Sequence, residues 1–390
     1  MWAGPISQAI GRYVSPCRES AALGSLLATS RRLFWVCSAA HGGVLLVLIA
    51  GGALLAQLDR TLAWVYSAGV ILSIIESGFA FTQTVRVQLR KRREVALNQA
   101  LFALTRPLLA ALLLSFLAPT ALVALVGYLI ATLLLTAVQA RLVRRLEGSS
   151  DRYSAELKTK LLKFSAPYLS WGLLGWLTIS GDRWILSHFT SAGVVGLYVA
   201  ALQVGTVVPM IAGQVISTFV SPVLNDRVGF ADDRERVKKT CLLLVRCLLS
   251  VFVLGMAGMV IVSIFREELL MLLTGAQYRA VAYAVPWLYL GNLFIQMAQF
   301  SFGIGPILFR PAAFVIPRNA AYIVTIMLMI WLSKTGGIRG LVAAYCIGGL
   351  LQFLVTAAVA VLIYRRHMSE MIKTPGTIDA GCAVQSRVSV

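Results

Sequence analysis

The sequence is poor in charged residues, which make up only 13% of its 390 positions, against roughly 25% in soluble proteins. Acidic residues are scarcest, at 16 against 35 Lys and Arg, and there are three His. This composition excludes an ordinary soluble domain. Instead, 58% of the residues are hydrophobic and the mean hydropathy is +0.81, as expected of a protein that lies in lipid.

Recognisable sites for chemistry are also lacking. The six cysteines form no Cys-x-x-Cys pair and have no His or acid at metal-ligand spacing, so the sequence predicts neither a metal site nor a disulfide. Hydrolytic triads and phosphate-binding glycine loops are missing too. No stretch between the apolar runs is long enough for a soluble catalytic domain. The sequence therefore predicts a protein that is not an enzyme and needs no cofactor.

Long apolar runs dominate what is present. A helix needs about 20 such residues to cross a bilayer, and backbone groups cannot stay unpaired in lipid, so each run is expected to be helical. The expected fold is an all-α polytopic membrane protein with about ten transmembrane helices. The ten runs are residues 33–55, 61–85, 97–117, 119–139, 164–187, 194–217, 240–265, 282–308, 312–333 and 340–364.

The positive charges are unevenly distributed between these runs. With the ten helices alternating in direction, 27 Lys and Arg fall on one side, five on the other and three within helices. This asymmetry follows the positive-inside rule and predicts that both termini are cytoplasmic. The net charge of +19 is thereby explained by topology and by attraction to anionic membrane lipids, and no nucleic-acid partner is expected.

The longest polar stretch divides the chain into two lobes. We predict a first helical lobe of four helices over residues 1–145, a cytoplasmic linker over 146–162, a second lobe of six helices over 163–367 and a cytoplasmic tail over 368–390. The amphipathic outer loop 266–279 is expected to form a short interfacial helix.

A short internal repeat relates the two lobes. Residues 8–16 (QAIGRYVSP) and 214–222 (QVISTFVSP) are identical at five of nine positions, and each is followed by a basic loop and a long apolar run. In the second lobe this peptide ends the second helix. The first lobe is therefore expected to lack two helices, which makes the chain a four-plus-six version of a twelve-helix transporter fold.

Each charged residue inside a spanning helix makes membrane insertion less favourable by about 2.5–3.5 kcal/mol. Such a residue is therefore expected to have a structural or functional role. Arg106 lies about 14 Å into its helix, near the midplane, and is the best candidate for a cation that lines a cavity; a structural pair with Glu76 is the alternative. Glu76 is also a candidate for ion coupling. Arg246 and Arg318 each lie about 9 Å from the cytoplasmic face, where they line a substrate path or extend to the interface.

Two further sets of polar residues lie in the second lobe. Asp182 and Arg183 lie about 27–29 Å along their helix, near its outer end, and neighbouring positions on a helix cannot pair well with each other. They are candidates for a substrate contact or for a structural role at the end of the hairpin. Asn292, Gln296 and Gln299 share one helix face, which faces a cavity or another helix.

The opening of the second lobe resembles a known family. The matching pieces are FSAP at residues 164–167, GDRWIL at 181–186 and AGVVGLY at 192–198, with LTGAQY at 273–278 before the eighth run. In this order and spacing they are similar to bacterial lipid-linked oligosaccharide flippases and polysaccharide exporters of the multidrug/oligosaccharidyl-lipid/polysaccharide (MOP) superfamily.

The resemblance implies two six-helix lobes around a cationic cavity, in the bacterial cytoplasmic membrane. The substrate would be an anionic polyprenyl-linked glycan, translocated by alternating access without covalent chemistry. Polysaccharide polymerase and export proteins would be partners. Arginines at the positions of Arg106, Arg183, Arg246 and Arg318 would attract the pyrophosphate, because a cation in a low-dielectric core lowers the cost of moving an anionic headgroup.

Three alternatives stay open from the residues. A drug or cation antiporter of the same superfamily would favour acids inside the membrane, whereas this chain has several arginines there. An O-antigen polymerase or ligase would need a larger outer loop carrying Arg or His. A truncated, inactive or partner-dependent homologue would follow from the expected lack of two helices.

Overall fold

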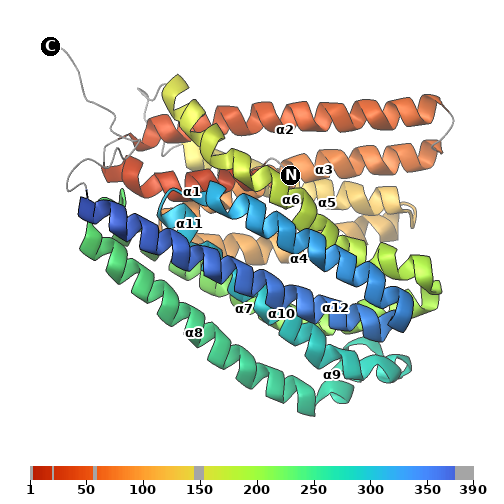
Figure 1. The fold of residues 1–390 in the computed structure, drawn as a ribbon. Helices are drawn as coiled ribbons and strands as arrows, with labels where there is room; N and C mark the ends of the chain where they lie inside the picture. Colours follow the sequence, from red (N-terminus) through yellow and green to blue (C-terminus); the bar gives the residue numbers. More distant parts are fainter. Residues whose placement is uncertain (1–2, 20–21, 56–58, 145–152, 374–390) are drawn as a thin grey trace. The chain divides into compact units, whose positions relative to one another are not determined.

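The computed structural model describes residues 3–19, 22–55, 59–144 and 153–373. These described residues form helices, with no strand among them, so the predicted all-α fold is confirmed. The linker residues 146–152 and the tail from 374 onward lie outside the described residues. The chain divides after Ala166 into two compact units (Figure 1).

The first unit contains five helices and the start of a sixth. Its helices are α1 (Ala3–Glu19), α2 (Leu23–Leu54), α3 (Arg60–Gln88), α4 (Arg92–Phe116) and α5 (Ala121–Arg144). α3 is central, because it packs against each of the other four. Asp59 caps α3, since its carboxylate accepts a hydrogen bond from the Thr61 amide at 3.0 Å and so satisfies one of the free donors at the helix start.

The second unit is built from longer helices. They are α6 (Ala155–Phe189, which crosses the boundary between the units), α7 (Ala192–Val228), α8 (Arg234–Ile264), α9 (Arg266–Thr274), η1 (Ala276–Ala284), α10 (Val285–Phe302), α11 (Ile304–Ile307), η2 (Pro311–Phe314) and α12 (Val315–Lys373). α10 is central and packs against α7, α8 and α12. The unit boundary falls at Pro167 inside α6, where proline removes a helical hydrogen bond.

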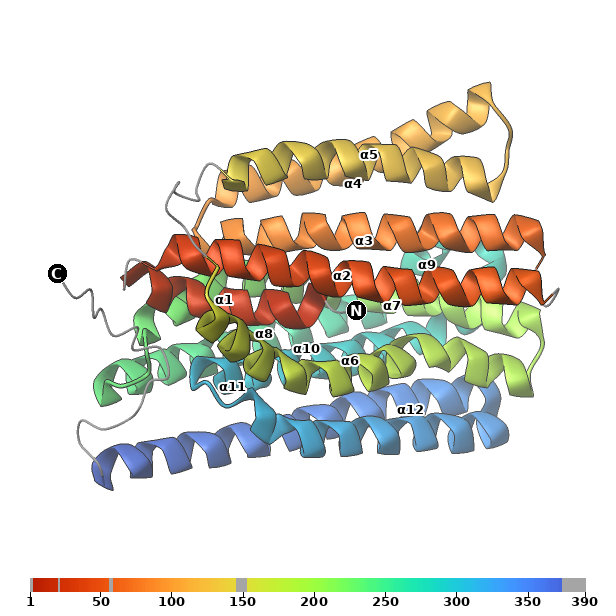
Figure 2. The ribbon, with the colours of Figure 1, turned by 90° about the horizontal axis from the view of Figure 1, so that it is seen from above.

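α12 is a hairpin of two arms. Gly337 has non-helical dihedral angles, with φ +53°, which glycine adopts at little cost. The arms on either side lie next to each other (Figure 2) and contain the two runs predicted at 312–333 and 340–364.

The same contact pattern occurs in both units. α1 packs against α2 and α3, and α2 packs against α3; likewise α7 packs against α8 and α10, and α8 packs against α10. The repeated peptide lies in α1 and near the end of α7, so the short sequence match corresponds to matching positions in the two packing patterns.

Eight described segments are long and apolar enough to cross a membrane. One of them, Pro311–Ile372, contains both arms of α12. α6 covers the remaining expected run at 164–187 but is not among the eight. Large apolar side chains such as Val253 and Leu254 of α8 are exposed, as a lipid-facing surface requires.

Several helix ends differ from the sequence prediction. α2 begins at Leu23 instead of residue 33, and α7 continues to Val228 instead of ending at 217. α6 begins at Ala155, so the second half of the predicted linker is helical. Apolar runs mark only the part of a helix that contacts lipid, whereas these helices continue as polar segments beyond it. The predicted run 282–308 is broken into η1, α10 and α11.

Glycine allows the closest approach between α10 and α12. A methyl group at Gly349 would overlap the backbone carbonyl of Gly291, and neither backbone can move without separating the two helices. Gly349→Ala is therefore expected to lower stability by about 1–3 kcal/mol, measured as a lower midpoint of thermal unfolding in detergent. Gly196→Ala in α7, where nothing lies within 4 Å of the added methyl, is the control. Equal midpoints for the two variants would contradict this close packing.

Candidate functional site

The buried acid of the second unit is Asp182, on α6. Its side chain is 0% exposed and accepts a hydrogen bond from the Tyr198 hydroxyl of α7 at 2.8 Å. The backbone N–H of Arg183 donates to its other oxygen at 2.7 Å. Asp182 therefore obtains its partner from the next helix, and it holds the α6–α7 hairpin together from inside.

A second group of polar side chains lies on α10 and α12. The Asn292 amide donates to the Tyr345 hydroxyl at 3.2 Å, and the Gln296 amide donates to the Asn292 carbonyl oxygen at 3.4 Å. Tyr345 and Tyr198 belong to the same cluster of buried side chains. Two of the three amides that the sequence placed on one face thus interact with each other within the unit.

Gln299, the third amide, is exposed on the surface of α10. No hydrogen bond of its side chain occurs within the part of the chain that the structure describes. The structure therefore does not bring Gln299 into the polar chain of Asn292 and Gln296.

Arg318 is a cation enclosed by aromatic rings. Its side chain is only 5% exposed. The guanidinium lies 5.0 Å from the ring centre of Phe302 and 5.8 Å from that of Tyr322, and it donates to the Tyr322 hydroxyl at 3.0 Å. Ring faces attract cations with about 0.5–2 kcal/mol each. The aromatic residues thus offset part of the cost of burying the charge.

Arg106 has a similar environment in the first unit. Its guanidinium lies 4.6 Å from the ring centre of Phe102 and 4.7 Å from that of Tyr128. It also forms an ion pair with Glu76 of α3, which is the structural alternative considered from the sequence. The side chain remains 21% exposed, so the pair lies at an accessible position on α3 and α4.

The two arginines occupy related places. Each lies next to a proline, Pro107 or Pro317, and each contacts one ring on its own helix and one on a neighbouring helix. Arg106 also forms an ion pair with an acid, Glu76.

Arg183 and Arg246 are exposed on α6 and α8. Neither forms an ion pair with an acid in the described ranges of the chain. Their charges therefore remain available to an anion or to solvent.

Sequence reasoning missed the aromatic partners. Tyr198, Tyr345, Tyr322 and Tyr128 supply the hydroxyls and ring faces that contact the charged and amide groups. A tyrosine inside an apolar helix is a weak signal in a sequence, because its ring packs like any hydrophobic residue. The hydroxyl becomes informative only when its partner is known.

A buried polar group of the first unit was also missed. The Thr82 hydroxyl donates to the Gln139 carbonyl oxygen at 2.9 Å, which joins α3 to α5. The neighbouring Gln83 is buried, and neither atom of its amide has a hydrogen-bond partner within the described residues. Such groups are satisfied in most proteins by a side chain or by water.

Comparison with solved structures identifies the fold. The chain is similar to an outward-facing multidrug-resistance MATE transporter of the MOP superfamily, with a TM-score of 0.70 and 15% identity over 96% of this chain and 84% of the other. A variant of the Vibrio cholerae MATE transporter VcmN gives a TM-score of 0.75 at 14% identity, covering 96% and 86%. A MOP superfamily transporter of Pyrococcus furiosus gives 0.73 at 15%, covering 96% and 84%.

No protein-family model matches the sequence, and no curated protein matches it. At these identities the structural likeness shows the fold alone. That fold is the one found in MATE transporters of the MOP superfamily.

Removing the Tyr198 hydroxyl should leave the buried Asp182 carboxylate without its side-chain hydrogen-bond donor. Tyr198→Phe is expected to lower stability by about 1–3 kcal/mol, measured by thermal unfolding in detergent. The double variant Tyr198→Phe/Asp182→Leu should lose less, because both partners are then apolar. Tyr66→Phe, at an exposed position of α3, is the matched control and should leave the midpoint unchanged. A double variant that is less stable than Tyr198→Phe would show that Asp182 has a different main partner.

The ion pair of the first unit can be tested by exchanging its charges. Arg106→Glu places two acids together and is expected to lower the unfolding midpoint, whereas Glu76→Arg/Arg106→Glu should recover at least half of the loss. Recovery is expected because the Coulomb attraction has the same sign when the partners are exchanged. The four proteins of the cycle are compared by thermal unfolding. Additive losses would mean that the two side chains do not interact.

Proposed function

We propose that the protein is a membrane transporter that moves a lipid-linked oligosaccharide across the cytoplasmic membrane by alternating access. One observation carries the choice of an anionic substrate. Within the predicted apolar runs of the described chain, both acids are engaged by protein groups, Glu76 by Arg106 and Asp182 by Tyr198. Arg183 and Arg246 are exposed without an acid partner in that part of the chain.

This balance of charge favours binding of an anion. A cation would have to displace a partner from Glu76 or Asp182 before it could use either acid. A pyrophosphate, by contrast, meets Arg183 and Arg246, which form no ion pair with an acid in the described residues. Arginine suits this role because its planar guanidinium binds two phosphate oxygens at once.

The fold is compatible with such a substrate. The solved structures with this fold include the Pyrococcus furiosus MOP superfamily transporter, in which a reverse polarity of the binding pocket suggests a different function. Proteins of this fold therefore differ in the polarity of the binding pocket. A cationic variant would fit a lipid-linked pyrophosphate.

In the proposed transporter the polar residues have separate roles. Arg318, Arg246 and Arg183 attract the pyrophosphate. Arg106 contributes less to this attraction, because its charge is engaged by the ion pair with Glu76. Asn292, Gln296 and Gln299 supply hydrogen bonds for sugar hydroxyls. Of the two acids, Glu76 would take part in ion coupling and Asp182 would contact the substrate. Polysaccharide polymerase and export proteins would receive the translocated glycan.

A drug or cation antiporter is the second candidate. It is favoured by the structural neighbours, several of which are MATE transporters, including one named as a multidrug-resistance protein. In that case Asp182 and Glu76 would bind the cation or the coupling ion, and the arginines would have structural roles.

Reconstituted protein separates the two candidates. Proteoliposomes are tested for flipping of a fluorescent polyprenyl-pyrophosphate oligosaccharide and for uptake of a cationic dye. The lipid-linked sugar is expected to flip and the dye is not. Arg246→Gln should slow flipping roughly tenfold to hundredfold, the value of a charge-assisted hydrogen bond.

Two controls accompany this assay. Arg246→Lys keeps the charge and should retain more activity than Arg246→Gln, and Arg279→Gln, at an exposed position of η1, should flip normally. Dye uptake without flipping would replace the flippase proposal by the antiporter. The same variants are then scored for restoring surface polysaccharide in a flippase-deficient bacterium.

A further inference from the structure

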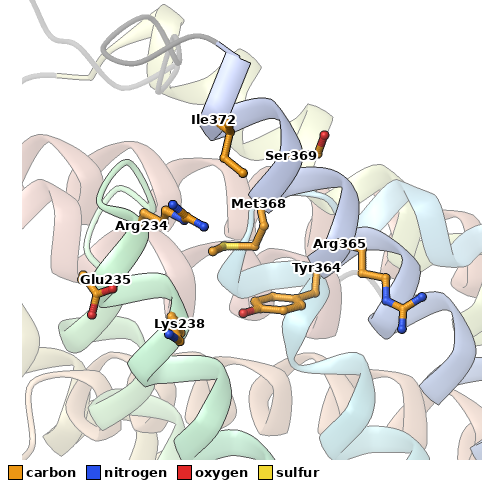
Figure 3. Close-up of a pocket in the computed structure, with 8 residues that line it drawn as sticks. All are labelled: Arg234, Glu235, Lys238, Tyr364, Arg365, Met368, Ser369 and Ile372. Atoms are coloured by element: carbon orange, nitrogen blue, oxygen red, sulfur yellow. The ribbon is translucent and has the colours of Figure 1, made fainter.

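A groove lies between the beginning of α8 and the end of α12, within the second unit (Figure 3). Its volume is about 560 Å³. The residues that line it are Arg234, Glu235, Lys238, Tyr364, Arg365, Met368, Ser369 and Ile372. None of them belongs to the polar residues proposed above for transport.

The groove has one basic wall and one largely apolar wall. Arg234 and Lys238 are four residues apart on α8, and Tyr364, Met368 and Ile372 follow at intervals of four on α12, so each set forms a stripe along one helix face. Figure 3 shows Arg234 and Lys238 facing Tyr364 and Met368 across the groove.

The basic charges of the groove have no acid partner in the portion of the chain described. Arg234, Lys238 and Arg365 form no ion pair there, while Glu235, the one acid of the lining, lies 3.9 Å from Lys239. Arg365 projects from α12 at the edge of the groove (Figure 3). The groove therefore presents a surplus of positive charge beside apolar side chains.

The end of α12 is fixed in place behind the groove. Glu370 forms ion pairs with Arg310 and with Arg366, the latter at 3.0 Å. The buried His367 ring lies 3.1 Å from the backbone carbonyl of Ala231, in the turn before α8. These contacts join the end of α12 to the segment before α8 and to the segment before η2.

The position of the groove along the helices matches a bilayer interface. The apolar run of α8 starts at residue 240, just after Lys238, and the last apolar run of α12 ends at residue 364. The groove thus lies where both helices change from apolar to charged, on the side that the positive-inside asymmetry assigns to the cytoplasm. Headgroups of the cytoplasmic leaflet occupy this level.

We infer that this groove binds an anionic phospholipid of the cytoplasmic leaflet. Its phosphate contacts Arg234 and Lys238, and the upper part of an acyl chain lies against Tyr364, Met368 and Ile372. A free phosphate would use the same cations, but the apolar stripe would then have no function. The inference does not depend on which substrate the protein transports.

Lipid binding is measured on the complete protein by native mass spectrometry and by thermal unfolding in detergent with added phosphatidylglycerol or phosphatidylcholine. Phosphatidylglycerol is expected to be retained and to raise the unfolding midpoint more than phosphatidylcholine does. Arg234→Gln/Lys238→Gln should weaken phosphatidylglycerol binding about 25-fold, since each basic residue near an anionic surface is worth roughly fivefold in affinity.

The matched control removes two charges elsewhere. Lys158 and Arg227 are exposed basic residues outside the groove, and Lys158→Gln/Arg227→Gln lowers the net charge equally. It should bind phosphatidylglycerol like the unchanged protein. Equal weakening in both double variants would overturn the inference, because binding would then depend on total charge.

Two further measurements separate lipid from phosphate. Inorganic phosphate at millimolar concentration should not displace the lipid, and Met368→Ser/Ile372→Ser should weaken lipid binding while the groove cations remain. Displacement by phosphate, together with unchanged lipid binding in the serine variant, would assign the groove to a soluble anion and overturn the lipid proposal. Unfolding midpoints without lipid check that all variants are folded.

Discussion

An ionised side chain in the hydrocarbon core of a bilayer must be met by protein groups, because water is not there to solvate it. This constraint explains the pairs found within both units. Glu76 is met by Arg106, Asp182 by the Tyr198 hydroxyl, and Arg318 by two aromatic rings. Each of these charged groups has a partner on another helix. The polar residues of this otherwise apolar chain therefore also specify which helices pack together.

The same constraint separates structural charges from available ones. A charge whose partner lies on the neighbouring helix stabilises the fold and has little capacity left for a ligand. Arg183 and Arg246 differ because no acid within the described residues engages them. In the proposed transporter, the charge offered to the substrate is therefore positive.

Much of the fold could be predicted because, in lipid, each segment has to pair its own backbone hydrogen-bonding groups. A run of about 20 apolar residues has to be a helix whatever its neighbours are, and the predicted runs do coincide with helices. The ends were harder, as α2 and α7 show, because a helix that leaves the bilayer continues with polar residues that carry no such signal. The break of the run 282–308 coincides with Pro286, Gly303 and Pro306.

By itself the sequence determined that the chain is all-helical, that its apolar runs are long enough to span a membrane, and that positive charge is concentrated between alternate runs. These properties follow from composition and spacing along the chain. Only the tertiary structure decided which partner each buried charge has, that α3 and α10 are the central helices of their units, and that Arg234 and Lys238 face an apolar stripe of α12. The reason is that such contacts join residues far apart in the sequence, as His367 and Ala231 illustrate at a separation of 136 positions, and no local pattern encodes them.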